Sequence, residues 1–121
     1  MKLILVVGLG GFIGSILRYL VSHFFHQRAS TSFPVGTFIV NLVGCFLIGL
    51  LFASFLKYKP SQEWQLFLIT GLLGGFTTFS AFSQESFSMM NKGEYGMALS
   101  YILLSVFGGI LLTSAGYFVG R

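Results

Sequence analysis

Long apolar runs alternate with short polar stretches along the whole chain. Four apolar segments stand out, and we place them at residues 3–25, 33–56, 64–90 and 95–119. Each exceeds the roughly 20 residues that an α-helix needs to cross about 30 Å of hydrocarbon. The connections HQRASTS, KYKPSQE and NKGE are short, so successive helices should run antiparallel. The pattern predicts one all-α domain, residues 1–121, with four transmembrane helices per subunit.

Composition strengthens the membrane assignment. Charged residues make up 8% of the 121 residues, whereas soluble domains usually carry about 25%. The single cysteine, Cys45, cannot form an intramolecular disulfide, and no cysteine cluster suggests zinc. No nucleophile–base pair or metal-ligand set is evident, so we expect no enzymatic activity. The basic residues flank the apolar segments, which is typical of a membrane protein and not of a nucleic-acid-binding protein.

The basic residues divide almost evenly between the two sides of the membrane. One side carries Lys2, Lys57, Lys59 and Arg121; the other carries Arg28 and Lys92, with Arg18 near that end of the first helix. Orientation follows the bias of Lys and Arg between short loops. Because this bias is small, we predict insertion in both orientations and hence an antiparallel, dual-topology homodimer.

Small residues four positions apart favour close helix packing in lipid. Gly10 and Gly14 form such a pair, and so do Gly116 and Gly120. We expect these pairs to support oligomerisation, because four helices alone leave little interior for a transport path.

The stretch GGFTTFSAF, residues 74–82, predicts that the third helix is broken near its middle. Glycines and threonines there make the segment easy to unwind. Non-helical backbone at membrane depth is tolerated where protein or a water cavity satisfies it, and such breaks often bind ions. Phe79 and Phe82 share one face, which Glu85 extends by three residues. An aromatic stripe is ordinarily core packing, but its position beside the break favours a functional interpretation.

Polar side chains inside the other segments are the remaining candidates. Asn41 stands among apolar neighbours, and burial of its amide without partners costs roughly 1–3 kcal/mol. An interhelical hydrogen bond and a donor facing a polar path both explain it, and Thr37 shares its face. Tyr101 and Ser105 begin a similar row in the fourth segment. Arg18 either snorkels to the headgroups or has a functional partner.

The chain resembles the Fluc family of fluoride channels, also called CrcB. The resemblance rests on GGFIGSILRY (residues 10–19), GTFIVNLVGCFLIG (residues 36–49) and GLLGGFTTFSAFS (residues 71–83), which occur in the family's order. It covers essentially the whole chain. It implies a dual-topology homodimer with two antiparallel pores and a structural sodium ion at the centre.

The resemblance also implies roles for individual residues. The fluoride pathway would include Asn41, Phe79, Phe82, Ser80, Thr37, Tyr101, Ser105 and Glu85. The backbone carbonyls of Gly74 and Thr77 would hold the central sodium, and the role of Arg18 stays open. Gly109 lacks the hydroxyl that extends the polar track in relatives, so the track past Ser105 is in doubt.

These implications give a functional hypothesis: passive export of fluoride across the cytoplasmic (inner) membrane, which lowers its cytoplasmic concentration. The partners would be fluoride, a second copy of the chain and the lipid bilayer, with no nucleic acid. The chief alternative is a small dual-topology, proton-coupled multidrug exporter. Such exporters need a carboxylate at the centre of a helix, whereas the first helix here has none and Glu85 lies late in the third. A structural subunit of a larger complex is a third hypothesis.

Overall fold

The computed structural model describes all residues, 1–121, and consists of helices joined by short turns. The elements are α1 (Lys2–Arg28), α2 (Val35–Tyr58), α3 (Gln62–Gln65), η1 (Leu66–Leu73), α4 (Gly74–Phe76), α5 (Phe79–Asn91) and α6 (Tyr95–Gly120). Elements α3 to α5 follow one another as a single interrupted span, so four helical spans are long and apolar enough to cross a membrane. The predicted number of spans is confirmed. Their ends extend up to three residues beyond the predicted limits, as at Arg28 against residue 25.

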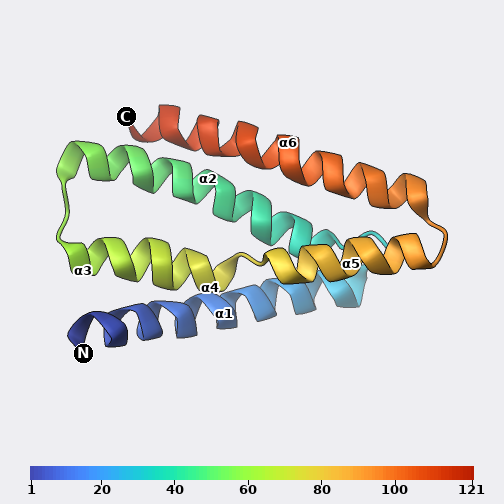
Figure 1. Ribbon diagram of the computed structural model, residues 1–121, viewed down its shortest axis with the longest axis horizontal. Coiled ribbons are helices and arrows are strands. Elements are labelled where there is room, and N and C mark those ends of the chain that lie inside the picture. The colour runs from blue at the N-terminus through green and yellow to red at the C-terminus, as the bar shows by residue number, and fades with distance from the viewer.

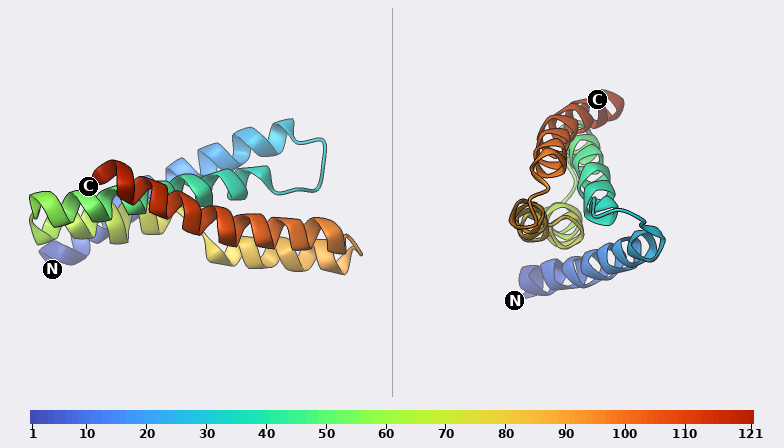
Figure 2. Two further views of the ribbon diagram at one scale, coloured as in Figure 1. Left: turned by 90° about the horizontal axis from the view of Figure 1, so that it is seen from above. Right: turned by 90° about the vertical axis from the view of Figure 1, so that its right-hand side faces the viewer.

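The four spans lie roughly along one direction, and both chain termini are at the same end (Figure 1). Helix α6 packs along α2, while α1 packs against η1 and α4. Viewed from the end, the spans form an open arc with α1 and α6 at its two extremes (Figure 2). Only 16 of the 121 residues are buried, so one copy of the chain encloses very little interior.

Glycines bring the helix backbones into contact within the subunit. A Cβ atom added at Gly10 would lie 2.8 Å from the backbone nitrogen of Leu72 in η1, and one added at Gly14 would collide with the carbonyl of Leu72. Gly116 and Gly120 contact the backbone of α2 in the same way. Both glycine pairs therefore pack helices of one subunit against each other. We expected these pairs to support contacts between subunits, and for these glycines that expectation is wrong. The small-residue pattern marks close approach but does not say which helix approaches.

The third span changes its helical geometry twice. Residues Leu66–Leu73 form a π-helix, which the sequence pattern did not predict. After α4, Thr77 and Thr78 are extended, with ψ of 157° and 117°, and a new helix then begins at Phe79. The predicted break near the middle of the third helix is confirmed (Figure 1).

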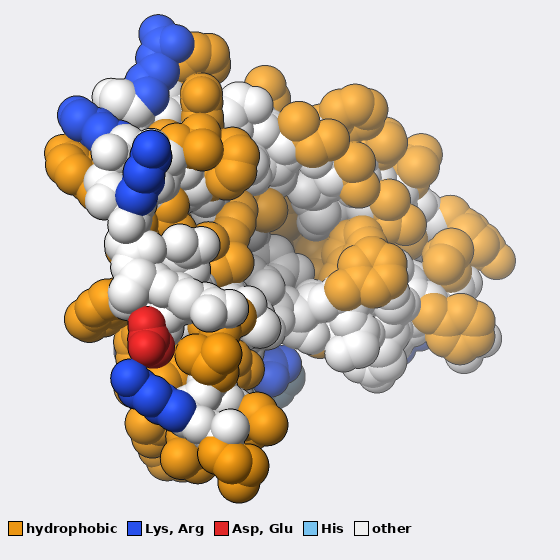
Figure 3. Space-filling view, turned by 60° about the vertical axis from the view of Figure 1, so that its left-hand side comes forward, with side chains coloured by type: hydrophobic (Ala, Val, Ile, Leu, Met, Phe, Trp, Pro, Cys, Tyr) orange, Lys and Arg blue, Asp and Glu red, His pale blue; other side chains and the backbone are white.

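Apolar side chains cover the flanks of the molecule. Most large hydrophobic residues on α1 and α6 are exposed, for example Phe12, Leu20, Phe107 and Leu111. Basic side chains gather at one end, above and below a single acidic group, while hydrophobic side chains dominate the sides (Figure 3). At this end Lys2 and Glu63 form an ion pair of 3.1 Å. This distribution is that of a protein whose sides face lipid and whose ends face water.

Candidate functional site at the helix break

Side chains close the break at both of its edges. On the α4 side, the backbone N–H of Thr77 donates to the carbonyl of Leu73 over 2.9 Å, and its hydroxyl donates to the same oxygen over 3.0 Å. On the α5 side, the hydroxyl of Thr78 accepts from the N–H of Ala81 over 3.2 Å and caps the new helix. The two threonines thus satisfy groups that an interrupted helix would leave unpaired.

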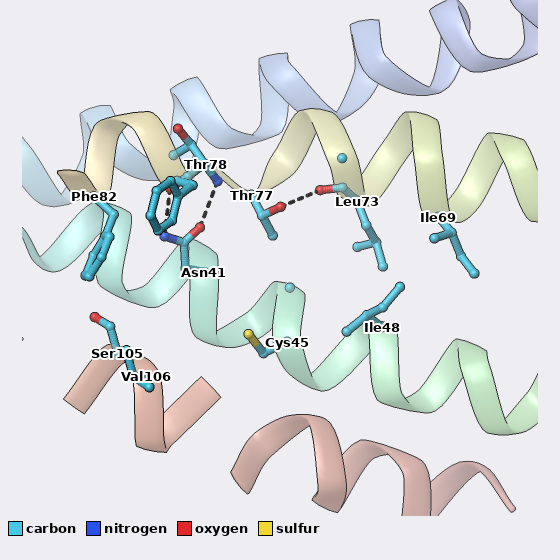
Figure 4. A pocket seen from close by; sticks show the side chains of 13 residues that line it. Asn41, Cys45, Ile48, Ile69, Leu73, Thr77, Thr78, Phe82, Ser105 and Val106 are labelled. Atoms are coloured by element: carbon cyan, nitrogen blue, oxygen red, sulfur yellow. Dashed lines mark hydrogen bonds between the residues drawn. The ribbon is translucent and has the colours of Figure 1, made fainter. Parts of the chain in front are cut away.

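Asn41 on α2 replaces the missing backbone partner of Thr78. Its Nδ2 donates to the Thr78 carbonyl over 3.0 Å, and its Oδ1 accepts from the Thr78 N–H over 2.8 Å (Figure 4). The side-chain amide therefore pairs with the backbone as a neighbouring strand would. An amide NH₂ group has two donors, so one N–H of Asn41 remains after these contacts. The interhelical hydrogen bond that we considered for Asn41 is present.

A cavity of about 420 Å³ lies beside the break. Its walls are formed by Asn41, Gly44, Cys45, Ile48, Ile69, Leu73, Gly74, Thr77, Thr78, Phe79, Phe82, Ser105 and Val106. None of these side chains is charged. The polar side chains in its lining are those of Asn41, Thr77, Thr78 and Ser105, among apolar side chains and two aromatic rings (Figure 4).

The two phenylalanines occupy the start of α5, at the edge of this cavity. Their ring centroids are 5.7 Å apart with an interplanar angle of 41°. Phe79 is 77% exposed in one copy of the chain. Phe82 is half-buried and packs on the ring of Tyr101, with centroids 5.1 Å apart.

Glu85 lies one turn further along α5 and receives two hydrogen bonds. The hydroxyl of Thr37 donates to its Oε1 over 2.7 Å, and the hydroxyl of Tyr101 donates to its Oε2 over 2.9 Å. The donors come from α2 and α6, so the carboxylate joins three helices. Sequence reasoning selected these three residues separately and did not foresee that they form one cluster.

Thr37 and Glu85 line a second cavity, of about 540 Å³. It lies between the end of α1, the turn that follows and the start of α2, and His23, His26 and Lys92 contribute to its wall. Phe82 lines the first cavity and touches Tyr101, which bonds to Glu85 in the second.

The candidate pathway residues therefore divide into groups. Asn41, Phe79, Phe82 and Ser105 line the cavity at the break, Thr37 and Glu85 line the second cavity, and buried Tyr101 lies between the two groups. Ser80 lines neither cavity; its exposed hydroxyl lies 3.3 Å from that of Thr78.

Sequence reasoning missed two contributors to the break site. Thr78, which Asn41 holds, was considered only as a helix breaker. Gly44, three residues after Asn41 and on the same face of α2, is buried against the methyl group of Thr77. Its signal was available, because a glycine at i+3 from a buried amide leaves room on that face for side chains of a neighbouring segment.

Three backbone oxygens at the break, those of Gly74, Phe76 and Thr77, accept no hydrogen bond from a side chain, a cap or a turn. Gly74 is exposed, and the nearest atom that an added Cβ would meet lies 3.7 Å away. Carbonyl oxygens without a hydrogen-bond partner are the type of ligand that binds a hard cation such as sodium.

Comparison with known proteins gives a consistent result along the whole chain. Residues 5–117 match the family model described as "CrcB-like protein, Camphor Resistance (CrcB)". A "Fluoride-specific ion channel FluC" of Desulfotalea psychrophila is 45% identical over 118 residues, which cover 98% of this chain and 91% of that protein. Proteins of the same name are 49% identical in Rhizobium meliloti, over 96% of this chain and 94% of that one, and 47% identical in Aquifex aeolicus, over 100% and 98%.

Proposed function

The chain belongs to the CrcB-like family, and on that premise we propose that it is a fluoride-selective channel that lets fluoride cross the membrane passively. The observation that carries the proposal is the uncharged cavity at the helix break. A small anion that leaves water needs replacement donors, and neutral amide and hydroxyl groups supply them without holding the ion too tightly. Conduction requires binding that permits exit as well as entry.

The aromatic rings would complete the anion's surroundings. The edge of an aromatic ring carries a positive partial charge and the face a negative one. Phe79 and Phe82 present their rings beside the remaining N–H of Asn41 and the hydroxyl of Ser105. Fluoride would pass between the second cavity and the break along Thr37, Glu85 and the ring of Phe82.

The break also supports a homodimer. The backbone of Gly74 and the hydroxyl of Ser80 are exposed near the middle of the third span in one copy of the chain. Polar groups without partners are costly against lipid. A second copy that covers the break removes this exposure, and the weak charge bias between the two ends allows that copy to be antiparallel.

The antiparallel arrangement has a direct test. In a Cys45→Ser background, a cysteine introduced as Arg121→Cys would be labelled by a membrane-impermeant maleimide from both sides of sealed vesicles. About half of the chains would react from each side. Labelling from one side only would contradict dual topology.

Sodium is the cation that we propose for the carbonyls of Gly74 and Thr77. Bound there, it would act as a structural ion that offsets the negative ends of carbonyl dipoles and joins the two subunits at their centre. Hydrogen bonds hold the sequence neighbours of these two residues, since Arg18 donates to Gly75 and Asn41 pairs with Thr78. The two oxygens would therefore be close to their final places before the ion binds.

We further propose that the channel lies in the cytoplasmic membrane and lowers cytoplasmic fluoride. Fluoride enters acidified cells as neutral HF, ionises at cytoplasmic pH and is trapped as the anion. A passive anion pathway would release it, and the chain would thereby confer fluoride resistance. The proton-coupled exporter is not favoured, because the relatives carry the name of a fluoride channel.

Fluoride efflux from liposomes tests the channel proposal. Purified protein would be reconstituted at low density, and a fluoride electrode would record release down a concentration gradient. We expect rapid release from vesicles that contain protein and almost none from empty vesicles. Equal release from the two preparations would reject the proposal, and equal release of chloride would reject selectivity.

A further inference from the structure

Arg18 is the only Lys, Arg, Asp or Glu residue of α1 between Lys2 and Arg28. Its side chain is half-buried, and its Nε donates to the carbonyl oxygen of Gly75 over 3.1 Å. The bond joins α1 to α4, across 57 residues of sequence. We propose that Arg18 is a positioning residue: through this one N–H it fixes the α4 side of the helix break. The proposal rests on the channel function proposed above.

The carbonyl of Gly75 needs a donor because the helix ends immediately after it. The two extended residues Thr77 and Thr78 interrupt the regular series of backbone hydrogen bonds. The Gly75 oxygen accepts none of the backbone hydrogen bonds found at turns and caps. An unpaired carbonyl is costly at membrane depth, where no bulk water replaces the lost bond. Arg18 supplies a donor from the neighbouring helix.

The packing of α1 places Arg18 at this oxygen. A Cβ added at Gly75 would lie 2.6 Å from the carbonyl oxygen of Gly11, so the two backbones are in direct contact. Gly14 contacts the next part of the same segment, at the nitrogen of Phe76. Gly11, Gly14 and Arg18 lie on one face of α1, since residues at i, i+3 and i+7 share a face. The glycines allow the approach and Arg18 completes it.

The break is thus held from two sides. Arg18 on α1 fixes Gly75, and Asn41 on α2 fixes Thr78. Each fixed residue is the sequence neighbour of one proposed sodium ligand, Gly74 or Thr77. A shift of either anchor would therefore displace a carbonyl of the cation site and, through Thr78, the start of the helix that carries Phe79.

An alternative role for Arg18 is direct attraction of the anion by its positive charge. Its side chain lines neither the cavity at the break nor the second cavity. The hydrogen bond also uses Nε and not the outer guanidinium nitrogens. Positioning and attraction therefore make opposite predictions for substitutions that separate the donor from the charge.

Three substitutions make that separation. Gln carries its amide nitrogen on Cδ, the same atom that carries Nε in Arg, so Arg18→Gln keeps the donor at its place without the charge. Lys has a methylene at that place and its charge one bond further, so Arg18→Lys keeps the charge and moves the donor. Arg18→Met has a similar length with neither feature. For each variant and for the wild type, the unfolding temperature would be measured in detergent. Fluoride efflux would be measured on separate samples reconstituted into liposomes.

We expect Arg18→Gln to retain most of the wild-type flux, while Arg18→Lys and Arg18→Met lose about tenfold or more, equivalent to ~1.4 kcal/mol on the barrier. We also expect Gln to lie closest to the wild type in unfolding temperature and Met furthest from it. Flux in the Lys variant that equals or exceeds that in the Gln variant would overturn the proposal. If Arg18→Met does not fold, the comparison of Gln with Lys still decides.

The same series separates this inference from the channel proposal. A wild type that releases no fluoride would reject the channel function, while the order of unfolding temperatures would still report the hydrogen bond. A conducting wild type with equal flux in all three variants would reject the role of Arg18 alone.

Discussion

Asn41 takes part in the site through three functional groups on one small side chain. Its carbonyl and one N–H hold Thr78, and the other N–H remains beside the cavity. Asn41→Asp would remove both donors and set a carboxylate oxygen against the Thr78 carbonyl. We predict a loss of stability of about 1–3 kcal/mol and almost complete loss of fluoride efflux. Asn91→Asp, at the exposed end of α5, is the matched control and should leave both quantities unchanged.

Phe82 lines the cavity at the break and packs on Tyr101, and we propose that its ring edge contacts fluoride. Phe82→Ile keeps an apolar side chain there but removes the ring and its positively polarised edge. We predict that fluoride efflux falls by about tenfold or more, a rise of ~1.4 kcal/mol in the barrier, while the protein still folds. Phe87→Ile changes an exposed ring on the same helix and should conduct as the wild type does. Similar rates in the two variants would remove Phe82 from the pathway.

At the residue scale, the sequence indicated which side chains are unusual but not which ones meet. Asn41 was selected because a buried amide is costly in an apolar helix. Thr37 and Glu85 were selected because they share a helical face with Asn41 and with the two phenylalanines, and Tyr101 because it begins a row of hydroxyls. Their contacts join positions 16 to 48 residues apart, and periodicity along one helix carries no information on such pairs. The bond from Arg18 to Gly75 was unpredictable for the same reason.

At the scale of elements, α1 and η1 pack through glycine. A methyl group at Gly14 would lie 2.9 Å from the nitrogen of Phe76 and would collide with the carbonyl of Leu72. We predict that Gly14→Ala lowers stability by about 1–3 kcal/mol through overpacking, seen as earlier thermal unfolding in detergent. At Gly8 nothing lies within 4 Å of the added atom, so Gly8→Ala is the control. Equal unfolding temperatures would show that α1 can move away from η1 at little cost.

The spans were predictable because the apolar runs are long and the charges fall between them. The break was predictable because Gly74, Gly75, Thr77 and Thr78 are poor helix formers clustered in one place. The π-helix at Leu66–Leu73 was not, since its residues are ordinary apolar ones and carry no local signal for a wider turn. Several helix ends, such as Arg28 and Tyr58, lie two or three residues past the predicted limits in the polar connections, whereas α2 begins two residues inside its limit, at Val35.

At the scale of the whole molecule, a single copy leaves Gly74 at the break exposed. If a sodium ion joins two copies there, its removal should weaken the channel without altering any side chain. We predict that fluoride efflux falls when sodium is replaced throughout by N-methylglucamine and recovers when sodium is restored. The same protein in potassium solution serves as a test of cation size. Unchanged efflux after exhaustive removal of sodium would contradict the proposed ion.

The central claim is that uncharged donors and ring edges at the broken helix conduct fluoride in preference to other ions. Recordings from a planar bilayer with a tenfold fluoride gradient, balanced by an opposing chloride gradient, test it most directly. We predict a current that reverses close to the fluoride equilibrium potential, about 59 mV in magnitude for a monovalent ion. Reversal at the chloride or sodium equilibrium potential would contradict the account. So would the absence of current from protein that releases fluoride from liposomes.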